Sequence, residues 1–244
     1  MKRNVWITGA SGGIGQAVAR RLAKEGYGLC LQYGRSRESA EQLEQELVKA
    51  GADVMTVQAD IACASDMQRA AVLAADRFGH IDALIHCAGI AQQKLFTDTT
   101  YEEWTRMLRI HLDGAYHACQ AVLPAMIRRH SGSIVLVSSI WGISGASCEV
   151  AYSTAKAGLI GMTKALAQEL GPSRIRVNCL APGVIDTPMN GNLDESSLEM
   201  LREDTPLQRI GTPDDVAGAA AFLISDDAGF ITGQVLSPNG GLVV

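Results

Sequence analysis

Tyr152 and Lys156 are the residues whose types and spacing most directly suggest chemistry. On a helix, a separation of four residues places both side chains on one face about 6 Å apart, so an ammonium lies beside a phenol. A phenol has a pKa of about 10 in water, and a nearby positive charge is expected to lower that pKa toward the working pH. Ser139, thirteen residues before Tyr152, adds a hydroxyl. A lone Tyr-x-x-x-Lys would be only a helix surface pair, but the three residues together predict a proton-transfer site.

A glycine-rich turn near the start of the chain predicts a dinucleotide site. The short apolar run 5–8 breaks into this turn, and a helical pattern follows at 16–25. Glycines allow a sharp turn and a close approach of the backbone to a ligand, while the free N–H groups at a helix start favour a pyrophosphate. The residues of the turn that we expect to contact the ligand are Gly9, Ser11, Gly12, Gly13, Ile14 and Gly15.

Apolar strand-like runs alternate with helical patterns along the chain. Such alternation is typical of parallel strands joined by helical crossovers. We therefore expect an α/β fold in a single domain, 1–244, with a doubly wound parallel sheet of seven strands and helices on both faces. The strands are expected at 5–8, 29–33, 54–58, 83–86, 134–138, 175–180 and 234–237, and the helices near 13–25, 39–50, 65–78, 101–129, 151–170 and 213–223.

The composition favours a globular cytoplasmic protein. With 244 residues, 47% of them hydrophobic, the chain can bury a large core. A net charge of -5 argues against nucleic acid as the main partner, because phosphate contacts need a basic surface. The first apolar run is too short for a signal peptide, and no stretch approaches the roughly 20 apolar residues of a membrane helix. We expect neither nucleic acid nor a membrane as a partner.

The cysteines and histidines are not spaced like metal ligands. Six cysteines are scattered without a CxxC pair, and the five histidines include no HExxH motif and fall in different expected elements. We interpret the cysteines as reduced, mostly buried thiols. No metal site is expected.

Further motifs occur in an order that resembles a known family. The sequence TGASGGIG is followed by Cys87-Ala88-Gly89, by Ser139, Tyr152 and Lys156, and by Pro182-Gly183. From about Val5 to the C-terminus the chain resembles a classical short-chain dehydrogenase/reductase, closest to the 3-oxoacyl-[acyl-carrier-protein] reductases. The resemblance implies a Rossmann fold, an NAD(P)-dependent oxidoreductase and a homotetramer. The apolar C-terminal run agrees with burial against another subunit.

The end of the second expected strand indicates which dinucleotide is bound. In NAD-preferring sites an acidic residue there binds the ribose hydroxyl and would repel a 2′-phosphate. This chain has no acid before Glu38 and instead carries Arg35, Ser36 and Arg37. Guanidinium groups pair bidentately with phosphate, so we expect NADP(H), with Arg35 and Ser36 as the nearest contacts. Alternatively, the two arginines only solvate a loop.

The resemblance also implies roles for individual residues. Tyr152 would donate a proton to the substrate carbonyl oxygen, Ser139 would hold that oxygen, and Lys156 would lower the pKa of the phenol and bind the nicotinamide ribose. Asp60 and Ile61 match the adenine-contacting position, although Asp60 could instead cap the following helix. Beyond these and the glycine turn, the implied dinucleotide contacts are Cys87, Ala88, Gly89, Pro182, Gly183, Val184, Ile185 and Thr187.

Two positions depart from the family pattern. Cys87 replaces an Asn in the turn, and we interpret it as a small core residue beside the cofactor. His111 replaces a catalytic Asn that, in the family, helps to hold a water linking the lysine to solvent. An imidazole could also hold a water, and its ordinary pKa near 6.5 would add a titration. His111 is a candidate proton-relay residue, or alternatively a packed histidine that replaces one hydrogen bond.

The expected substrate contacts are Ser139, Trp141, Glu149 and Tyr152. Trp141 and Glu149 lie between the serine and the tyrosine, in the segment that lines the substrate pocket in this family. The Glu149 carboxylate could pair with a cationic group of the substrate, or it could cap the helix start. The segment 187–208, rich in Asn, Asp, Glu and Met, is the expected substrate lid.

The expected activity is NADPH-dependent reduction of a ketone to a secondary alcohol, with a 3-oxoacyl-[acyl-carrier-protein] of fatty acid biosynthesis as the first candidate substrate. Arg128, Arg129 and Arg174 match a region where such reductases keep a basic patch for the acidic carrier protein, or they are ordinary helix-end charges. Some relatives reduce an aminopentanone group on elongation factor P, which gives an alternative substrate. A catalytically inactive scaffold that binds the dinucleotide is an alternative of another class, and only His111 argues for it.

Overall fold

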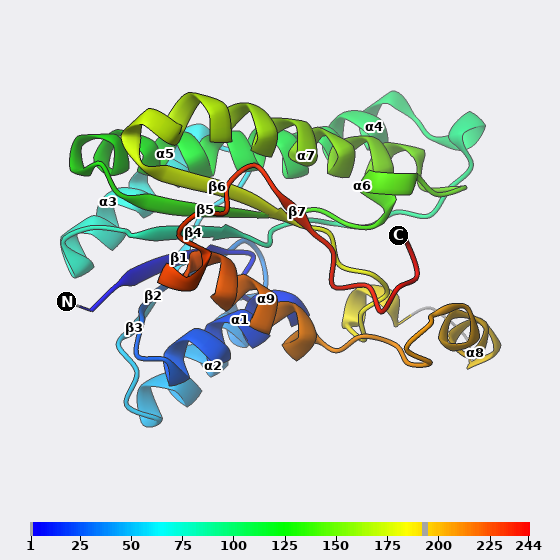
Figure 1. The fold of residues 1–244 in the computed structure, drawn as a ribbon, viewed down its shortest axis with the longest axis horizontal. Coiled ribbons are helices and arrows are strands. Elements are labelled where there is room, and N and C mark those ends of the chain that lie inside the picture. Colours follow the sequence, from blue (N-terminus) through cyan, green and yellow to red (C-terminus); the bar gives the residue numbers. More distant parts are fainter. Residues whose placement is uncertain (1, 192–194) are drawn as a thin grey trace.

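A seven-stranded parallel sheet organises the computed structural model, which describes residues 2–191 and 195–244 (Figure 1). The strand order is β3-β2-β1-β4-β5-β6-β7, and every neighbouring pair is parallel. The expected α/β fold is confirmed. The strands are β1 (Asn4–Thr8), β2 (Gly28–Tyr33), β3 (Val54–Gln58), β4 (Ala83–His86), β5 (Gly132–Val137), β6 (Ile175–Leu180) and β7 (Val235–Leu236).

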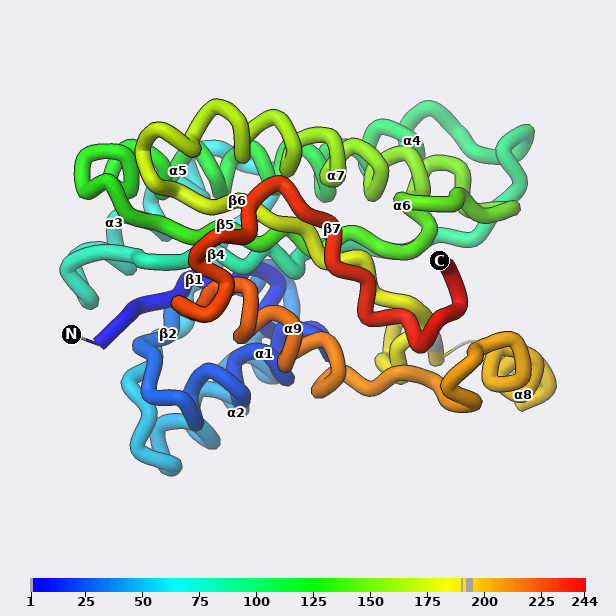
Figure 2. Tube along the Cα trace, viewed as in Figure 1, coloured from blue at the N-terminus to red at the C-terminus, as the bar shows by residue number. Residues whose placement is uncertain are grey.

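Helices cover both faces of the sheet, so the sheet is doubly wound, as expected. Figure 2 shows α1, α2 and α9 on one face and α3, α5 and α7 on the other. The bounds of the helices are α1 (Gly13–Lys24), α2 (Arg37–Lys49), α3 (Ala64–Phe78), α4 (Tyr101–Leu108), α5 (Gly114–Arg129), α6 (Trp141–Ser144), α7 (Val150–Leu170), α8 (Glu195–Asp204) and α9 (Pro213–Ile224).

The strands are apolar because both faces of the sheet are buried. Alternate residues of β1 point to opposite faces: Trp6 packs with α3 and α5, whereas Val5 and Ile7 pack with α1 and α9. All three side chains are completely buried. Two apolar cores, one on each face, therefore hold the sheet rigidly beneath its loops.

The two central strands create the crevice in which this kind of sheet binds ligands. After β1 the chain turns outward through α1 to β2, and it later returns on the other side of β1 as β4. Thr8 and His86 are direct neighbours at the carboxyl ends of these two strands. In open parallel sheets ligands bind at such a switch point, outside the carboxyl ends.

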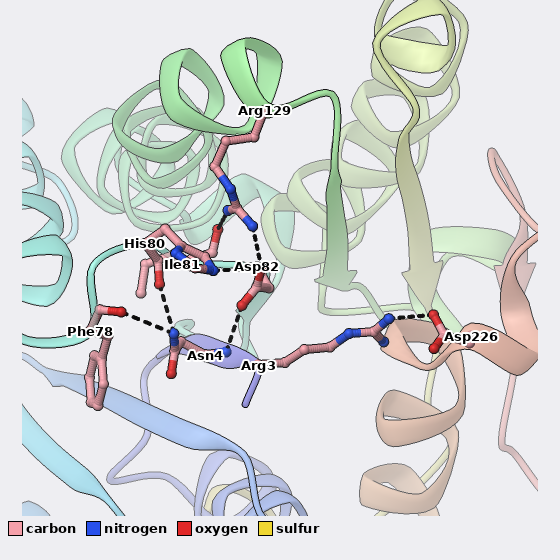
Figure 3. A network of polar contacts seen from close by, with 8 residues as sticks. All are labelled: Arg3, Asn4, Phe78, His80, Ile81, Asp82, Arg129 and Asp226. Carbon is pink, nitrogen blue, oxygen red and sulfur yellow. Dashed lines mark hydrogen bonds and ion pairs between the residues drawn. The ribbon is translucent and has the colours of Figure 1, made fainter. Parts of the chain in front are cut away.

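The opposite, amino edge of the sheet is closed by a polar network (Figure 3). The Asp82 carboxylate accepts hydrogen bonds from the Asn4 N–H at 2.8 Å and from the Arg129 guanidinium at 2.6 Å, and the His80 ring lies 3.3 Å from it. The Asn4 amide donates to the carbonyl oxygens of Phe78 and His80. These contacts tie β1 to the start of β4 and to the end of α5.

The structure differs from the expected helices in three places, and one of them is the short helix α6, which lies where no helix was expected. The expected helix 101–129 is interrupted by a π-helical turn, Arg109–Asp113, which separates α4 from α5. The expected lid, 187–208, contains a short 3₁₀ helix, Pro188–Asn190, and α8, neither of which the sequence pattern indicated. Residues 192–194 of that segment lie outside the described residues, and its action as a lid stays a prediction.

The described residues contain neither a helix suited to span a membrane nor a cluster suited to bind a metal. Within 2–191 and 195–244, no helix combines the length and the apolar character that crossing a bilayer requires. The same residues contain no group of three or more His, Cys, Asp or Glu side chains arranged to bind a metal ion.

Candidate active site

The glycine turn after β1 has a backbone that side chains would block. Gly9 has φ +64°, and a Cβ placed on it would lie 2.6 Å from the Ala88 Cα. A Cβ on Gly15 would lie 2.4 Å from the Gly9 oxygen. The turn thus packs directly against the turn after β4. No side chain caps α1 at Gly12, so the first N–H groups of the helix are free to bind an anion.

The segment after β6 closes over the same turn. A Cβ on Gly13 would lie 2.8 Å from the Thr187 methyl carbon, and one on Gly183 would lie 2.8 Å from the Asn239 Cα. The Ile140 N–H donates to the Pro182 oxygen at 3.0 Å, which joins this segment to the loop after β5. The residues 182–187 and the glycine turn, predicted separately, therefore form one continuous cradle.

At the end of β2 the two arginines have different surroundings. The Arg37 guanidinium lies 3.4 Å from the Tyr33 hydroxyl and 3.5 Å from the Glu41 carboxylate. Arg35 is exposed, and no hydrogen bond or ion pair of its side chain is found among the described residues. Ser36 occupies the N-cap position of α2 without a capping hydrogen bond from its side chain. Arg35, Ser36 and the start of α2 are thus available to bind a phosphate.

The loop after β3 holds Asp60 and Ile61 in different environments. The exposed Asp60 carboxylate accepts from the Ala62 N–H at 2.9 Å, and the Asp60 N–H donates to the Asp66 carboxylate at 2.9 Å. Cys63, not Asp60, is the N-cap residue of α3. The alternative that Asp60 caps this helix is therefore wrong. Ile61 is buried against Gly114, where a Cβ would lie 2.7 Å from its side chain.

Ser139, Tyr152 and Lys156 meet at the carboxyl edge of the sheet. Tyr152 and Lys156 lie in the first two turns of α7, and Ser139 follows β5. The Lys156 ammonium lies 5.4 Å from the centroid of the Tyr152 ring and donates to the Val137 oxygen at 2.8 Å. The Ser139 hydroxyl acts on the Tyr152 phenol by lowering its pKa, and the Trp141 N–H donates to the Ser139 hydroxyl at 3.2 Å. The four-residue spacing of Tyr152 and Lys156 therefore correctly predicted that the two side chains lie together.

Burial shifts the pKa values of Tyr152 and Lys156 in the directions that favour the neutral form of each side chain. Burial raises the pKa of Tyr152 to about 12, against the opposing effect of the nearby Ser139 hydroxyl. Burial likewise lowers the pKa of Lys156 to about 8. The expectation that Lys156 lowers the pKa of Tyr152 toward the working pH is wrong, because the desolvation of the phenol outweighs its favourable contacts.

Two fully buried histidines lie beside Lys156. His86 ends β4, and its Nδ1 lies 2.9 Å from the Thr8 hydroxyl. His111 lies in the π-helical turn, with its Nε2 2.8 Å from the Ile90 oxygen and its ring edge-on to Tyr152 at 5.6 Å. Within the described residues, His86 Nε2 and His111 Nδ1 have no hydrogen-bond partner. Buried imidazole nitrogens of this kind can hold a water.

Both histidines are neutral at physiological pH. Burial and the nearby Lys156 lower the pKa of His86 to about 3 and that of His111 well below its ordinary value. The titration near pH 6.5 that the sequence suggested for His111 is therefore wrong. A role of His111 in holding a water or packing on Tyr152 stays a prediction.

The turn after β4 makes room for His111. A Cβ on Gly89 would lie 2.4 Å from the His111 ring, so only glycine fits there. Burial raises the pKa of the Cys87 thiol to about 12, which keeps it neutral beside Lys156. Cys87 is partly buried and packs against the core, which agrees with its interpretation as a small core residue; its place beside the cofactor stays a prediction.

Glu149 lies at the entrance of α7 with its carboxylate half-buried. Its backbone oxygen accepts from the Ser153 N–H at 2.8 Å, but its side chain makes no capping hydrogen bond. Burial raises the pKa of the Glu149 carboxyl. The negative charge of Glu149 in turn raises the pKa of Tyr152. The preceding residue, Cys148, has φ +61°, and its oxygen accepts from the Lys94 N–H at 2.7 Å. Glu149 is held near the phenol by its backbone, and its side chain does not cap the helix.

Sequence reasoning missed two residues of this region. His86 was recognised as the end of a strand and not as part of the site, although it directly precedes Cys87. Gln32, a buried amide in β2, bonds to the glycine turn at 2.9 Å. A polar residue inside an otherwise apolar strand was the available signal in both cases.

A glycine turn at a switch point of a parallel sheet, together with a Ser-Tyr-Lys cluster at the same edge, defines an oxidoreductase of the Rossmann type. A family profile described as enoyl-(acyl carrier protein) reductase matches residues 9–243. A crystal structure titled short-chain dehydrogenase/reductase SDR:glucose/ribitol dehydrogenase, from Brucella melitensis, superposes with a TM-score of 0.93 at 36% identity and covers 100% of both chains. The chain belongs to the short-chain dehydrogenase/reductase family.

Curated relatives extend over nearly the whole chain. The uncharacterized oxidoreductase YmfI of Bacillus subtilis is 40% identical over 99% of both chains. The 3-oxoacyl-[acyl-carrier-protein] reductase FabG of Chlamydia muridarum is 40% identical over 97% of this chain and 95% of the relative. FabG of Staphylococcus epidermidis is 36% identical over 99% of both. These similarities support an enzyme that uses a nicotinamide cofactor.

Proposed function

We propose that this protein reduces a ketone to a secondary alcohol with NADPH, and that its substrate is a 3-oxoacyl group linked to acyl carrier protein. The observation that carries the proposal is the convergence of Ser139, Tyr152 and Lys156 at the sheet edge beside the glycine turn. The names of the FabG relatives support the substrate class.

The residues present fit a dinucleotide. Gly9 and Gly15 stand where any side chain would collide with backbone, so glycine at both positions allows the turn to fold tightly and present the start of α1. The uncapped start of α1 offers N–H groups to a pyrophosphate. Asp60 and Ile61 would hold the adenine, while the segment 182–187 would cover the nicotinamide end.

The chemistry follows from the protonation states of the site. The chemistry that NADPH would supply when bound is a hydride for the carbonyl carbon. Tyr152, fully protonated at pH 7 because of its raised pKa, donates its proton to the carbonyl oxygen, which yields the neutral alcohol. Ser139 holds the same oxygen by a hydrogen bond. The Lys156 ammonium stabilises the phenolate that the proton transfer leaves behind.

The preference for NADP(H) rests on Arg35. Because Arg37 is engaged by Tyr33 and Glu41, the free guanidinium at Arg35 is the group that would pair with a 2′-phosphate. Changing Arg35 to Ser should weaken the binding of NADPH by about tenfold, because one charged pair is lost. The binding of NADH should be unaffected. Arg37→Ser is the matched control. Equal use of NADH and NADPH by the unaltered protein would contradict the preference.

The arginines predicted to bind the carrier protein do not lie near the catalytic edge of the sheet, so they do not support a carrier-linked substrate. Arg129 is bound to Asp82 at the amino edge of the sheet, and Arg174 follows the far end of α7. A helix of 21 residues is about 30 Å long, so these charges lie far from Tyr152. The carrier-linked substrate rests on the relatives alone.

A second candidate substrate is a ketone that bears an amine, such as the aminopentanone group of elongation factor P. The observation that favours it is Glu149, whose half-buried carboxylate has no hydrogen-bond partner among the described residues and acts electrostatically on Tyr152. A cationic substrate group would satisfy this carboxylate, whereas a neutral acyl chain would leave it unpaired.

One assay panel separates these possibilities. NADPH oxidation is measured with acetoacetyl-acyl carrier protein, a free acetoacetyl thioester and an amino ketone, for the unaltered protein and Glu149→Gln. Preference for the carrier-linked substrate, unchanged in Glu149→Gln, supports the first candidate. Preference for the amino ketone that Glu149→Gln abolishes supports the second. NADPH binding without turnover of any ketone would instead support the inactive scaffold.

A further inference from the structure

Gln32 is a buried amide in the middle of an apolar strand. All six residues of β2 are buried, and Gln32 has only 2% of its surface exposed. Taking an amide out of water without hydrogen bonds costs roughly 1–3 kcal/mol, so its contacts must compensate. Gln32 belongs to none of the groups described above as catalytic.

Both ends of the Gln32 amide are bonded to loops that follow other strands. Its Oε1 accepts from the Gly9 N–H at 2.9 Å, and its Nε2 donates to the Ala59 oxygen at 2.7 Å. Its backbone oxygen also accepts from the Ala10 N–H at 3.0 Å. One residue thus fixes two successive amides of the glycine turn and the last residue before Asp60.

These bonds set the separation of two loops. Gly9 has φ +64°, and its oxygen accepts from the Gly12 N–H at 3.1 Å, so its orientation determines where α1 starts. Ala59 determines where Asp60 and Ile61 begin. The Gln32 side chain is the direct hydrogen-bonded connection between these loops across the end of β2.

We propose that Gln32 is a positioning residue for the dinucleotide, whose amide holds the glycine turn and the β3 loop at the separation that one bound dinucleotide spans. This inference rests on the proposed function. Its chemistry requires both a donor and an acceptor: an apolar side chain would leave the Gly9 N–H and the Ala59 oxygen unpaired. A carboxylate would keep the first bond and face the Ala59 oxygen with negative charge.

Asn178 provides a matched control. It is also a fully buried amide in a strand second from an edge of the sheet, and it bridges two backbone groups of the segment before β7, donating to the Ile231 oxygen at 2.8 Å and accepting from the Gln234 N–H at 3.1 Å. Its partners lie around β7, away from the glycine turn. Asn178→Leu therefore reproduces the loss of a buried amide bridge without touching the loops that Gln32 connects.

The experiment compares Gln32→Met, Gln32→Glu and Asn178→Leu with the unaltered protein in two measurements. The first is hydrogen exchange of the protein without cofactor. Loss of one buried hydrogen bond corresponds to about tenfold faster exchange. We expect that change at 9–16 and 59–62 in Gln32→Met, mainly at 59–62 in Gln32→Glu, and in neither segment in Asn178→Leu.

The second measurement is NADPH affinity by fluorescence titration together with steady-state kinetics. In Gln32→Met we expect about tenfold weaker NADPH binding with kcat at saturating NADPH within about threefold, and in Asn178→Leu unchanged affinity. Unchanged exchange and affinity in Gln32→Met, or equal losses in both apolar variants, would overturn the positioning role. If the unaltered protein does not bind NADPH, the proposed function fails, while the exchange measurement still decides whether Gln32 holds the loops.

Discussion

The two edges of the sheet use polar residues in opposite ways. At the amino edge, Asn4, Asp82 and Arg129 satisfy one another in a closed network (Figure 3). At the carboxyl edge, His86 and His111 each keep a nitrogen without a partner among the described residues, and the desolvated Lys156 has only a backbone oxygen as its hydrogen-bond acceptor.

The amino edge of the sheet therefore contributes mainly to stability, and the carboxyl edge mainly to reactivity. Paired charges at the amino edge fix β1, β4 and α5 relative to one another. The unsatisfied groups at the carboxyl edge are costly for folding, and such costs are retained where a site needs shifted pKa values or empty hydrogen-bonding positions. Substitutions at the two edges should therefore change different observables.

The largest effect is expected from Tyr152→Phe at the carboxyl edge. Removing the phenol hydroxyl removes the proton donor, so kcat should fall by about 10³-fold. The affinity for NADPH, measured by fluorescence titration, should stay within about twofold, and the thermal midpoint should not fall. Near-normal turnover of this variant would remove Tyr152 from the mechanism.

Asp82→Ala, at the amino edge, should lower stability and leave turnover unchanged, the reverse of the result expected for Tyr152→Phe. The carboxylate accepts from the Asn4 N–H and from the Arg129 guanidinium, so its loss should lower the free energy of unfolding by about 2 kcal/mol or more. Chemical denaturation would measure that loss. The kcat of the folded fraction should be unchanged. A fall in kcat without a change in stability would contradict the separation of the two edges.

The pH dependence of kcat/KM reports Lys156 in the free enzyme. Because the pKa of Lys156 is lowered to about 8, its ammonium is present below that pH and is lost above it. We expect a plateau at neutral pH and a decline of about tenfold per pH unit above 8. In Lys156→Arg the plateau should be lower, and the decline should vanish because a guanidinium keeps its charge.

The smallest effect is expected from His111→Asn. Since the pKa of His111 is already far below its ordinary value, the variant should leave the pH–rate profile between 5 and 8 unchanged. The loss of the edge-on contact with Tyr152 should lower kcat by no more than about threefold. Disappearance of an acidic limb near pH 6.5 in the variant would show that the imidazole titrates during turnover after all.

Much of the fold could be predicted because it depends on local patterns. Buried parallel strands have continuous apolar runs, and the expected 54–58, 83–86 and 175–180 agree with β3, β4 and β6. The fold class followed from their alternation with helical patterns. Helix α8 was missed because its sequence is mostly polar, with Arg202 bonded to Glu195 and Glu199. Such surface pairs leave little trace in hydrophobic periodicity.

The candidate site was predictable in its members but not in its electrostatics. The spacing placed Lys156 beside Tyr152, which the structure agrees with, yet the pKa of the phenol is set mainly by burial. Burial arises from tertiary packing that no local spacing encodes. The π-helical turn at His111 was invisible for the same reason, because its ring occupies space left by Gly89, more than twenty residues earlier.

The strand order also determines which strand pairs can form early during synthesis of the chain and which must form late. β2 follows β1 closely in the chain and can pair with it early, but the other side of β1 waits for β4, some eighty residues later. During that interval the nascent chain presents Val5, Trp6 and Ile7 along an open strand edge with unpaired backbone groups, a template for association with other chains. Once the chain through Ala88 is available, β4 can close that edge and bring Ala88 against Gly9.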